Sequence, residues 1–227
     1  MKTFVFASNN SHKLAEVRPI LAPHTVLSLS DIGCAIDIEE NGTTLEANSQ
    51  IKAQAIMEWM RRYSPDKLAT IEGVFADDTG LEIDALGGQP GVYTARWAGE
   101  AHNDALNRRK ALSELQGITN RQAQFRTVIT LISGTHTLQV EGVVRGSIAT
   151  EEYGNNGFGY DPIFIPEGYD KTFAELKENW RHRLEYEDDQ RELADNTFYN
   201  WRQKIPGTIG AIIERVPGTQ KYTIKNR

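Results

Sequence analysis

The sequence predicts an α/β protein built around a mixed β-sheet. Strand-like segments alternate with segments of helical periodicity along the chain, which is the pattern of this fold class. Residues 125–133 and 138–148 are two strand-like runs around Gly134-Thr135-His136, and such a hairpin cannot belong to a purely parallel sheet. With 39% hydrophobic and 25% charged residues, the composition is that of an ordinary globular protein.

The chain opens with a strand, a short polar turn and a helix. Residues 3–7 have the β-branched and aromatic content of a strand. Leu14, Val17, Ile20 and Leu21 then recur at the spacing of one helix face.

A second helix is predicted from about residue 44 to residue 62. Thr43 opens it, with Glu46 three residues later, which is the spacing of a capping box. We expect the helix to end before Ser64-Pro65, because the residue before a proline disfavours helical geometry.

The middle of the chain continues the alternation. Residues 73–77 predict a buried strand, and the segment 81–86 follows it. The glycine-rich residues 87–91 predict a hard turn, and residues 103–116 have a helical pattern.

Charge and cysteine content limit the partners and the compartment. The net charge of -6 argues against long nucleic acid as a partner, because polyanion binding needs a clustered excess of Lys and Arg. A single cysteine, Cys34, cannot form an internal disulfide and is expected to be a buried or loop thiol. No signal-peptide pattern and no membrane-spanning apolar run is found, so we expect a cytoplasmic location without membrane association.

The first candidate for chemistry is the polar turn from Ser8 to Lys13, which contains Asn10. It precedes a helix N-terminus, where free backbone N–H groups and the helix dipole favour an anion such as a triphosphate. The alternative is that Ser and Asn here only cap the helix, since they are preferred caps.

The second candidate is the pair Asn48 and Lys52 on the second helix, which follows the segment Glu39-Glu40-Asn41-Gly42. Residues four apart share a helix face, and this face also carries Leu45, Ala55 and Trp59. A lysine beside an apolar stripe needs an anionic partner or a wet cleft. Alternatively, Lys52 extends from the helix edge into water.

The third candidate is Ala76-Asp77-Asp78-Thr79-Gly80, placed at the end of the hydrophobic strand. Two carboxylates where a buried strand emerges are costly unless a cation binds them, and carboxylate oxygens suit Mg²⁺. The alternative is a turn in which a solvated Asp pair serves no ligand.

The fourth candidate is the glycine-rich segment from Gly154 to Pro162. Its three glycines let the backbone approach a ligand closely, while Phe158 and Tyr160 offer flat apolar rings for a base and Asp161 adds a carboxylate. The alternative is a surface loop whose aromatic residues fill the core.

Together and in this order, the four segments resemble the inosine triphosphate pyrophosphatase family over residues 1–183. Family members carry Thr/Ser-x-Asn-x-x-Lys, Glu-x-Gly, Asn-x-x-x-Lys, Ala-Asp-Asp-Ser-Gly-Leu, Ala-Leu-Gly-Gly-x-Pro-Gly, Ser-Ala-Arg and Gly-Phe-Gly-Tyr-Asp-Pro-Ile-Phe. The matching positions are Ser8, Asn10, Lys13, Glu40, Gly42, Asn48, Lys52, residues 76–81, 85–91, 94–96 and 157–164. Thr79 stands where the family has Ser and keeps the hydroxyl.

The last family motif, Lys-Asn-x-x-Ser-His-Arg, is the poorest match. Lys177, His182 and Arg183 keep its spacing, but Glu178 and Arg181 replace the Asn and the Ser. This departure affects the part of the pattern that holds the purine rather than the reaction type.

The resemblance implies an elongated mixed sheet with two α/β lobes, an active-site cleft between them, and a homodimer. Residues 1–183 would form a single catalytic domain of two lobes. Residues 184–227 would be a C-terminal extension packed on the same domain, with a role that the sequence does not assign. Within it, the sequence predicts a polar, acid-rich helix over residues 185–203 and a short hairpin beyond Pro206.

The activity implied is Mg²⁺-dependent hydrolysis of ITP, dITP and XTP between the α- and β-phosphates. Glu40 and Asp78 would hold the metal, Asp78 would accept a proton with Asp77 as its helper, and Lys52 would act on the phosphates. The substrate-binding residues implied are Ser8, Asn10, Lys13, Asn48, Thr79, Phe158, Gly159, Tyr160, Asp161, Lys177, His182 and Arg183.

The sequence also allows two other functions. A pyrophosphatase for pyrimidine or other modified nucleotides would keep the metal and phosphate residues and change the base loop. A non-catalytic nucleotide sensor would bind ITP without turnover.

Overall fold

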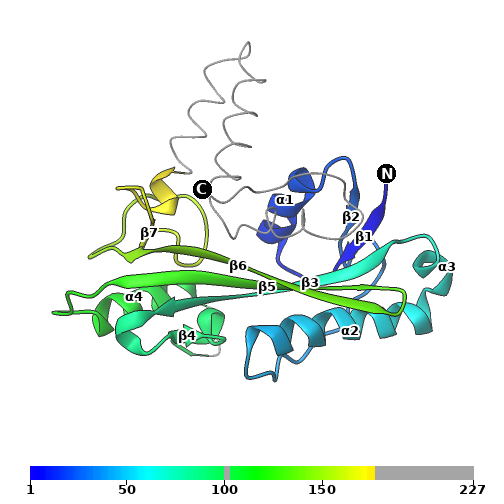
Figure 1. Ribbon diagram of the computed structural model, residues 1–227, viewed down its shortest axis with the longest axis horizontal. Coiled ribbons are helices and arrows are strands. Elements are labelled where there is room, and N and C mark those ends of the chain that lie inside the picture. The colour runs from blue at the N-terminus through cyan, green and yellow to red at the C-terminus, as the bar shows by residue number, and fades with distance from the viewer. Residues whose placement is uncertain (100–102, 177–227) are drawn as a thin grey trace, which may run out of the picture. The chain divides into compact units, whose positions relative to one another are not determined.

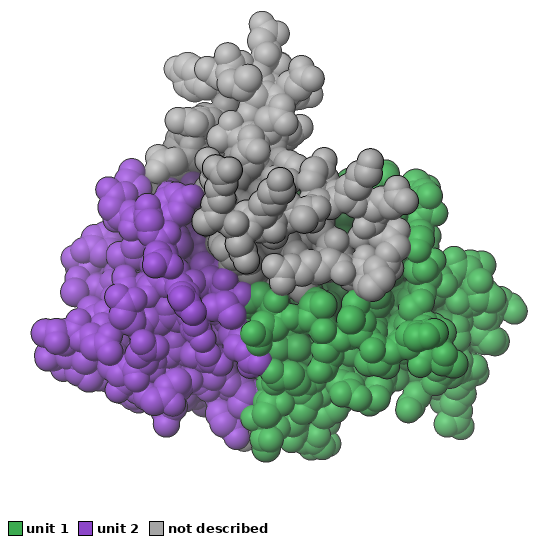
Figure 2. Space-filling view, in the orientation of Figure 1, with its two compact units in different colours: residues 1–78, 127–142, 207–227 green, residues 79–126, 143–206 purple. Residues whose placement is uncertain are grey.

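The computed structural model describes residues 1–99 and 103–176, which divide into two compact units (Figure 2). Unit 1 comprises residues 1–78 and 127–142, and unit 2 comprises residues 79–126 and 143–176. The predicted helix over residues 185–203 and the predicted hairpin beyond Pro206 lie outside the described residues.

A seven-stranded mixed sheet is the framework of the fold (Figure 1). The strand order is β2-β1-β3-β5-β6-β7, and β4 pairs with β3. Strand β1 is parallel to β2 and β3, whereas β4 is antiparallel to β3 and β7 is antiparallel to β6. The predicted α/β class with a mixed sheet is confirmed. The strands are β1 (Thr3–Phe6), β2 (Thr25–Leu27), β3 (Gly73–Ile83), β4 (Gln89–Gly91), β5 (Gln122–Ser133), β6 (His136–Ile148) and β7 (Phe164–Pro166).

The three longer helices follow the predicted order, and they are α1 (Ser11–Ile20), α2 (Leu45–Tyr63) and α4 (Asp104–Glu114). The short helix α3 (Pro65–Leu68) was not predicted, and the chain also forms the 3₁₀ turns η1 (Asp84–Leu86) and η2 (Thr94–Arg96). The predicted cap of α2 is wrong by one residue: Thr44, not Thr43, is the N-cap, and its Oγ1 accepts a hydrogen bond from Ala47 N. Because Ala47 occupies the third helical position, Glu46 cannot complete a capping box.

Strand β3 does not end where the sequence suggested. It runs without interruption from Gly73 to Ile83, so Asp77 and Asp78 lie inside the strand and the alternative of an Asp-containing turn is wrong. The segment 81–86 divides between the end of β3 and the turn η1, and the predicted turn over residues 87–91 leads into β4. Gly87 has φ 64°, a conformation that favours glycine.

Unit 1 has an apolar core on each face of its part of the sheet. On one face, Val74 and Ala76 pack with Ile56 and Met60 of α2. On the other face, Phe75 packs with Val17 of α1. Figure 1 shows the two helices on opposite sides of β1 and β3. Because side chains alternate along a strand, Asp78 continues the face that α2 covers and Asp77 continues the face that α1 covers.

Unit 2 has its own core, which fixes α4 and the glycine-rich loop on the sheet. Ala111 of α4 and Leu115, the C-cap residue of this helix, pack with Tyr160 and Phe164. Ile83 at the end of β3 belongs to the same cluster. Over residues 1–99 and 103–176, no helix combines the length and apolar character that crossing a bilayer requires.

Candidate functional site

Lys52 is the centre of a charged cluster in unit 1. Its Nζ lies 3.1 Å from Glu40 Oε2 and 3.2 Å from Asp78 Oδ1, and its side chain is only 12% exposed. The lysine therefore has anionic partners, and the alternative in which it extends into water is wrong. Burial lowers the pKa of Lys52, but the negative charges of Asp78, Asp77 and Glu40 together raise it above its ordinary value. Lys52 is thus a fixed positive charge.

Asp78 is buried, and one of its carboxylate oxygens has no hydrogen-bond partner among the described residues. Burial raises the pKa of the Asp78 carboxyl, the nearby Glu40 charge raises it further, and Lys52 and Lys13 only partly oppose this. Its Oδ1 accepts from Lys52, whereas its Oδ2 is buried without a hydrogen-bond partner. A buried carboxylate oxygen without a donor is costly, so the arrangement favours a proton or a cation at this atom.

Asp77 pairs with a different lysine. Its Oδ2 lies 2.5 Å from Lys13 Nζ, and its side chain is 1% exposed. Lys13 comes from α1, on the face of the sheet opposite α2. The two adjacent carboxylates are therefore neutralised separately, one from each side of the strand.

In the polar turn, the capping interpretation holds for Asn10. Its Oδ1 accepts from the backbone N–H groups of His12 and Lys13, and Ser8 Oγ accepts from Asn10 N. Two of the amides that could have bound an anion are therefore already used. The side chains of Ser8, Asn10 and Lys13 remain as possible donors to a phosphate.

Asn48 positions the segment that carries Glu40. It is 1% exposed, and its Oδ1 accepts from Gly42 N at 2.8 Å. Gly42 has no room for a side chain, because a Cβ there would lie 2.5 Å from Asn48 Oδ1. The Nδ2 of Asn48 is buried without a hydrogen-bond partner. The Asn48 side chain thus holds the Glu40 loop through its Oδ1 and has an unused donor at its Nδ2.

The remaining predicted substrate residues that the structure describes belong to the other unit. Thr79 follows Asp78 in β3 and is the first residue of unit 2. Lys177, His182 and Arg183 lie outside the described residues. The prediction that they contact the purine therefore stays a prediction.

The glycine-rich loop contains one core aromatic residue. Tyr160 is 4% exposed, belongs to the core of unit 2, and donates its hydroxyl to Thr94 O. Burial, together with the charge of Asp104, raises the pKa of Tyr160. The alternative of an aromatic side chain that fills the core thus holds for Tyr160, and Phe158 is the half-buried ring of this loop.

Asp161 stabilises the same loop by a hydrogen bond within it. Its Oδ2 accepts from Phe158 N at 2.9 Å. A Cβ at Gly157, where φ is 89°, would meet the Asp161 carboxylate, so the loop depends on glycine there. At least one carboxylate oxygen of Asp161 is therefore used by the backbone.

Two residues of α4 that sequence reasoning missed also hold this loop. Asp104 Oδ2 accepts from Gly159 N, and Arg108 Nη1 donates to Gly159 O, both at 2.8 Å. Their spacing of four residues on a predicted helix was visible in the sequence. Nothing in the sequence connects that helix face to a loop about fifty residues later.

Comparison with known proteins decides the family. The model of the Ham1 family matches residues 4–189. The chain belongs to the Ham1 family. The predicted resemblance to the inosine triphosphate pyrophosphatase family is confirmed by relatives named dITP/XTP pyrophosphatase. One, from Flavobacterium psychrophilum, is 47% identical over 184 residues, covering 79% of this chain and 92% of the relative. Another, from Bacillus subtilis, is 44% identical over 194 residues, covering 83% and 93%.

Solved structures of Ham1 proteins have the same fold. The Staphylococcus aureus Ham1 protein is 36% identical with a TM-score of 0.67, covering 89% of this chain and 99% of its own. A HAM1 protein from Coxiella burnetii is 33% identical with a TM-score of 0.66, covering 90% and 100%.

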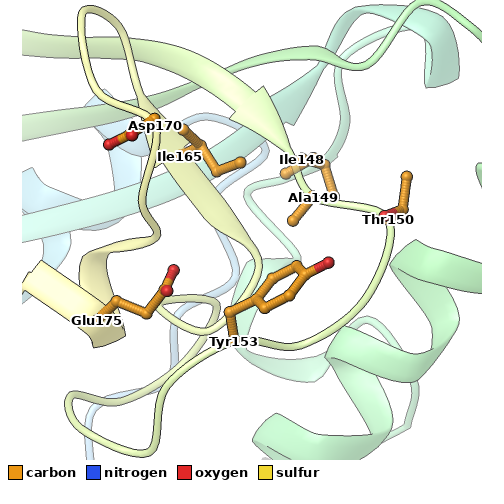
Figure 3. Close-up of a pocket in the computed structure, with 7 residues that line it drawn as sticks. All are labelled: Ile148, Ala149, Thr150, Tyr153, Ile165, Asp170 and Glu175. Carbon is orange, nitrogen blue, oxygen red and sulfur yellow. The ribbon is translucent and has the colours of Figure 1, made fainter.

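A pocket of about 370 Å³ in unit 2 of this Ham1 chain contains none of the predicted site residues (Figure 3). It is lined by Ile148, Ala149, Thr150, Tyr153, Ile165, Asp170 and Glu175. Glu175 already accepts from Thr172 N and from the Thr172 hydroxyl. The charged cluster around Lys52, and not this pocket, is therefore the candidate site.

Proposed function

We propose that this chain hydrolyses non-canonical purine nucleoside triphosphates, namely ITP, dITP and XTP, between the α- and β-phosphates. The products are the nucleoside monophosphate and pyrophosphate. The observation that carries the proposal is the convergence of Glu40 and Asp78 on Lys52, within 3.2 Å. Two carboxylates beside a fixed lysine are a suitable arrangement for phosphoryl chemistry. The names of the relatives support the substrate class.

A divalent cation fits the same cluster. The described residues hold no group of three or more His, Cys, Asp or Glu side chains arranged as a metal site. Mg²⁺, however, typically binds through one or two carboxylates and completes its shell with phosphate and water. Glu40 and the unpartnered Asp78 Oδ2 supply two such carboxylates. When bound, Mg²⁺ would supply positive charge for the phosphate oxygens.

The residues of the chain would then have separate catalytic and binding roles. Asp78, whose pKa is raised, would accept the proton of the attacking water. Lys52 would contact the phosphates, assisted by the hydroxyl of Thr79. Lys13 would bind phosphate with Ser8 and Asn10, and Asp77 would act as helper by holding Lys13.

Base recognition would fall to the glycine-rich loop and the segment after it. Phe158 would stack on the purine, beside Gly159. Tyr160 and Asp161 would shape this surface, and Lys177, His182 and Arg183 would add polar contacts. Donors arranged for a 6-oxygen stay unpaired when adenine enters, so ATP would be a poor substrate.

The larger assembly is proposed from the same resemblance. Residues 1–183 would act as one catalytic domain with residues 184–227 packed on it, and two copies would form a homodimer in the cytoplasm. Sedimentation of the purified protein, with and without a deletion of residues 184–227, would test the homodimer and the packing of the extension.

The decisive experiment separates the products formed from ITP by anion-exchange chromatography, with and without Mg²⁺. We expect IMP and pyrophosphate, formed only when Mg²⁺ is present. Release of IDP and phosphate would contradict the proposed cleavage site. Binding of ITP without turnover would favour the nucleotide sensor, and faster turnover of dUTP or dTTP would favour a pyrimidine enzyme.

The contact between Asn48 and Gly42 gives a prediction about Glu40. Gly42→Ala should push Asn48 aside, and Asn48→Ala should remove the acceptor for Gly42 N, so both variants should displace the Glu40 loop. We expect each to raise the Mg²⁺ concentration for half-maximal activity about tenfold, the scale of one lost buried hydrogen bond. Since both break the contact between Asn48 and Gly42, their effects should be less than additive in the double variant, although a Cβ at position 42 would still meet Ala47 Cβ at 2.8 Å. Fully additive effects would contradict the coupling.

A further inference from the structure

Both backbone polar groups of Gly159 are held by one face of α4. Asp104 accepts from Gly159 N, and one helical turn later Arg108 donates to Gly159 O, each at 2.8 Å. Hydrogen bonds with an ionised partner are the stronger kind. Gly159 itself has φ 60°, so its backbone is in a conformation that few other residues would adopt.

Arg108 also contacts the residues just before this loop. Its Nε lies 3.0 Å from Glu152 Oε2 in an ion pair, without a hydrogen bond at that nitrogen. The Arg108 side chain is 16% exposed, whereas that of Glu152 is 41% exposed. A half-buried guanidinium therefore links the two ends of segment 152–159.

Successive amides of the loop are held by two different carboxylates. Asp161 accepts from Phe158 N, and Asp104 accepts from Gly159 N. Asp161 is part of the loop and shapes it, but Asp104 and Arg108 attach it to α4, where Ala111 and the C-cap residue Leu115 are fully buried. The position of the Phe158 backbone is thus set by α4.

We propose that Asp104 and Arg108 are positioning residues for nucleobase selection, acting through the backbone of Gly159 on Phe158. The inference rests on the proposed function, in which Phe158 stacks on the purine. Holding a recognition surface in its binding geometry before the ligand arrives reduces the ordering cost of binding. Loss of either contact should therefore weaken nucleotide binding and reduce the preference for ITP. It should leave unchanged the residues of unit 1 that are proposed to bind phosphate and metal.

The test compares Arg108→Met and Asp104→Ala with Arg109→Met. Arg109 is the exposed neighbour on the same helix and provides the matched control. We expect Arg108→Met and Asp104→Ala to raise KM for ITP about tenfold, the scale of a lost charge-assisted hydrogen bond, with kcat changed less than KM. The ratio of kcat/KM for ITP to that for GTP should fall, and Arg108→Lys should restore part of it.

A second readout does not depend on turnover. Amide hydrogen exchange at residues 157–161 should accelerate in both variants and stay unchanged in Arg109→Met. If wild-type protein cleaves ITP to IMP and pyrophosphate but the variants lose only thermal stability, with KM, selectivity and exchange unchanged, the positioning role is wrong and the function stands. If wild-type protein does not cleave ITP, the proposed function is wrong, and unchanged exchange would then overturn the attachment of the loop as well.

Discussion

Asp78→Asn is expected to lower kcat for ITP hydrolysis by at least about a thousandfold, because it removes the proposed proton acceptor and one proposed metal ligand together. The amide is nearly the same size, and Lys52 keeps Glu40 as a partner at 3.1 Å, so we expect the fold to persist. Steady-state rates of pyrophosphate release would measure the loss. Circular dichroism would confirm that the variant is folded.

Asp66→Asn is the matched control for this change. Asp66 lies exposed in the first turn of α3, where the same substitution should leave kcat unchanged. If Asp78→Asn kept more than about a tenth of wild-type kcat, Asp78 could not be the proton acceptor. Binding of a non-hydrolysable ITP analogue to both variants would separate loss of chemistry from loss of affinity.

Lys52→Met is expected to reduce kcat about a hundredfold or more, since it removes a preorganised positive charge near the transferring phosphate. The acid limb of its pH profile should also move. Burial already raises the pKa of Asp78, and the charge of Lys52 partly opposes this, so the pKa should rise further without the lysine. Because Asp78 would work in its ionised form, activity should then appear only at higher pH.

A profile of kcat/KM against pH for wild type, Lys52→Met and Lys2→Met would test this direction. Lys2 forms an exposed pair with Glu72 and serves as the control, with no shift expected. An acid limb that stays in place, or moves to lower pH, would show that Lys52 does not act on the proposed base.

The two buried aspartates show how far the sequence could predict this site. Their identity and their need for positive partners followed from carboxylates next to a hydrophobic strand. The prediction that the strand ends at these aspartates was wrong. Lys13 and Lys52 neutralise the two carboxylates, so β3 continues through them. Pairing between segments as far apart as Lys13 and Asp77 has no local signal in the chain.

Other predictions failed or succeeded for similarly local reasons. The alternation of strands and helices depends on hydrophobic period, and it predicted every long element among the described residues. The choice between Thr43 and Thr44 as the cap of α2 depends on one backbone angle, which the sequence does not determine. Whether Tyr160 faces a ligand or the core depends on Thr94 O, a partner 66 positions away.

The alternation of Asp77 and Asp78 across β3 has a consequence for how this segment can change in evolution. Replacing a side chain near them alters one contact. Inserting or deleting a single residue ahead of them in the strand would move both carboxylates to the opposite faces of the sheet. The lysine on α1 and the lysine on α2 would each then face the wrong partner. We therefore expect related chains to vary in composition along this strand while keeping its length constant.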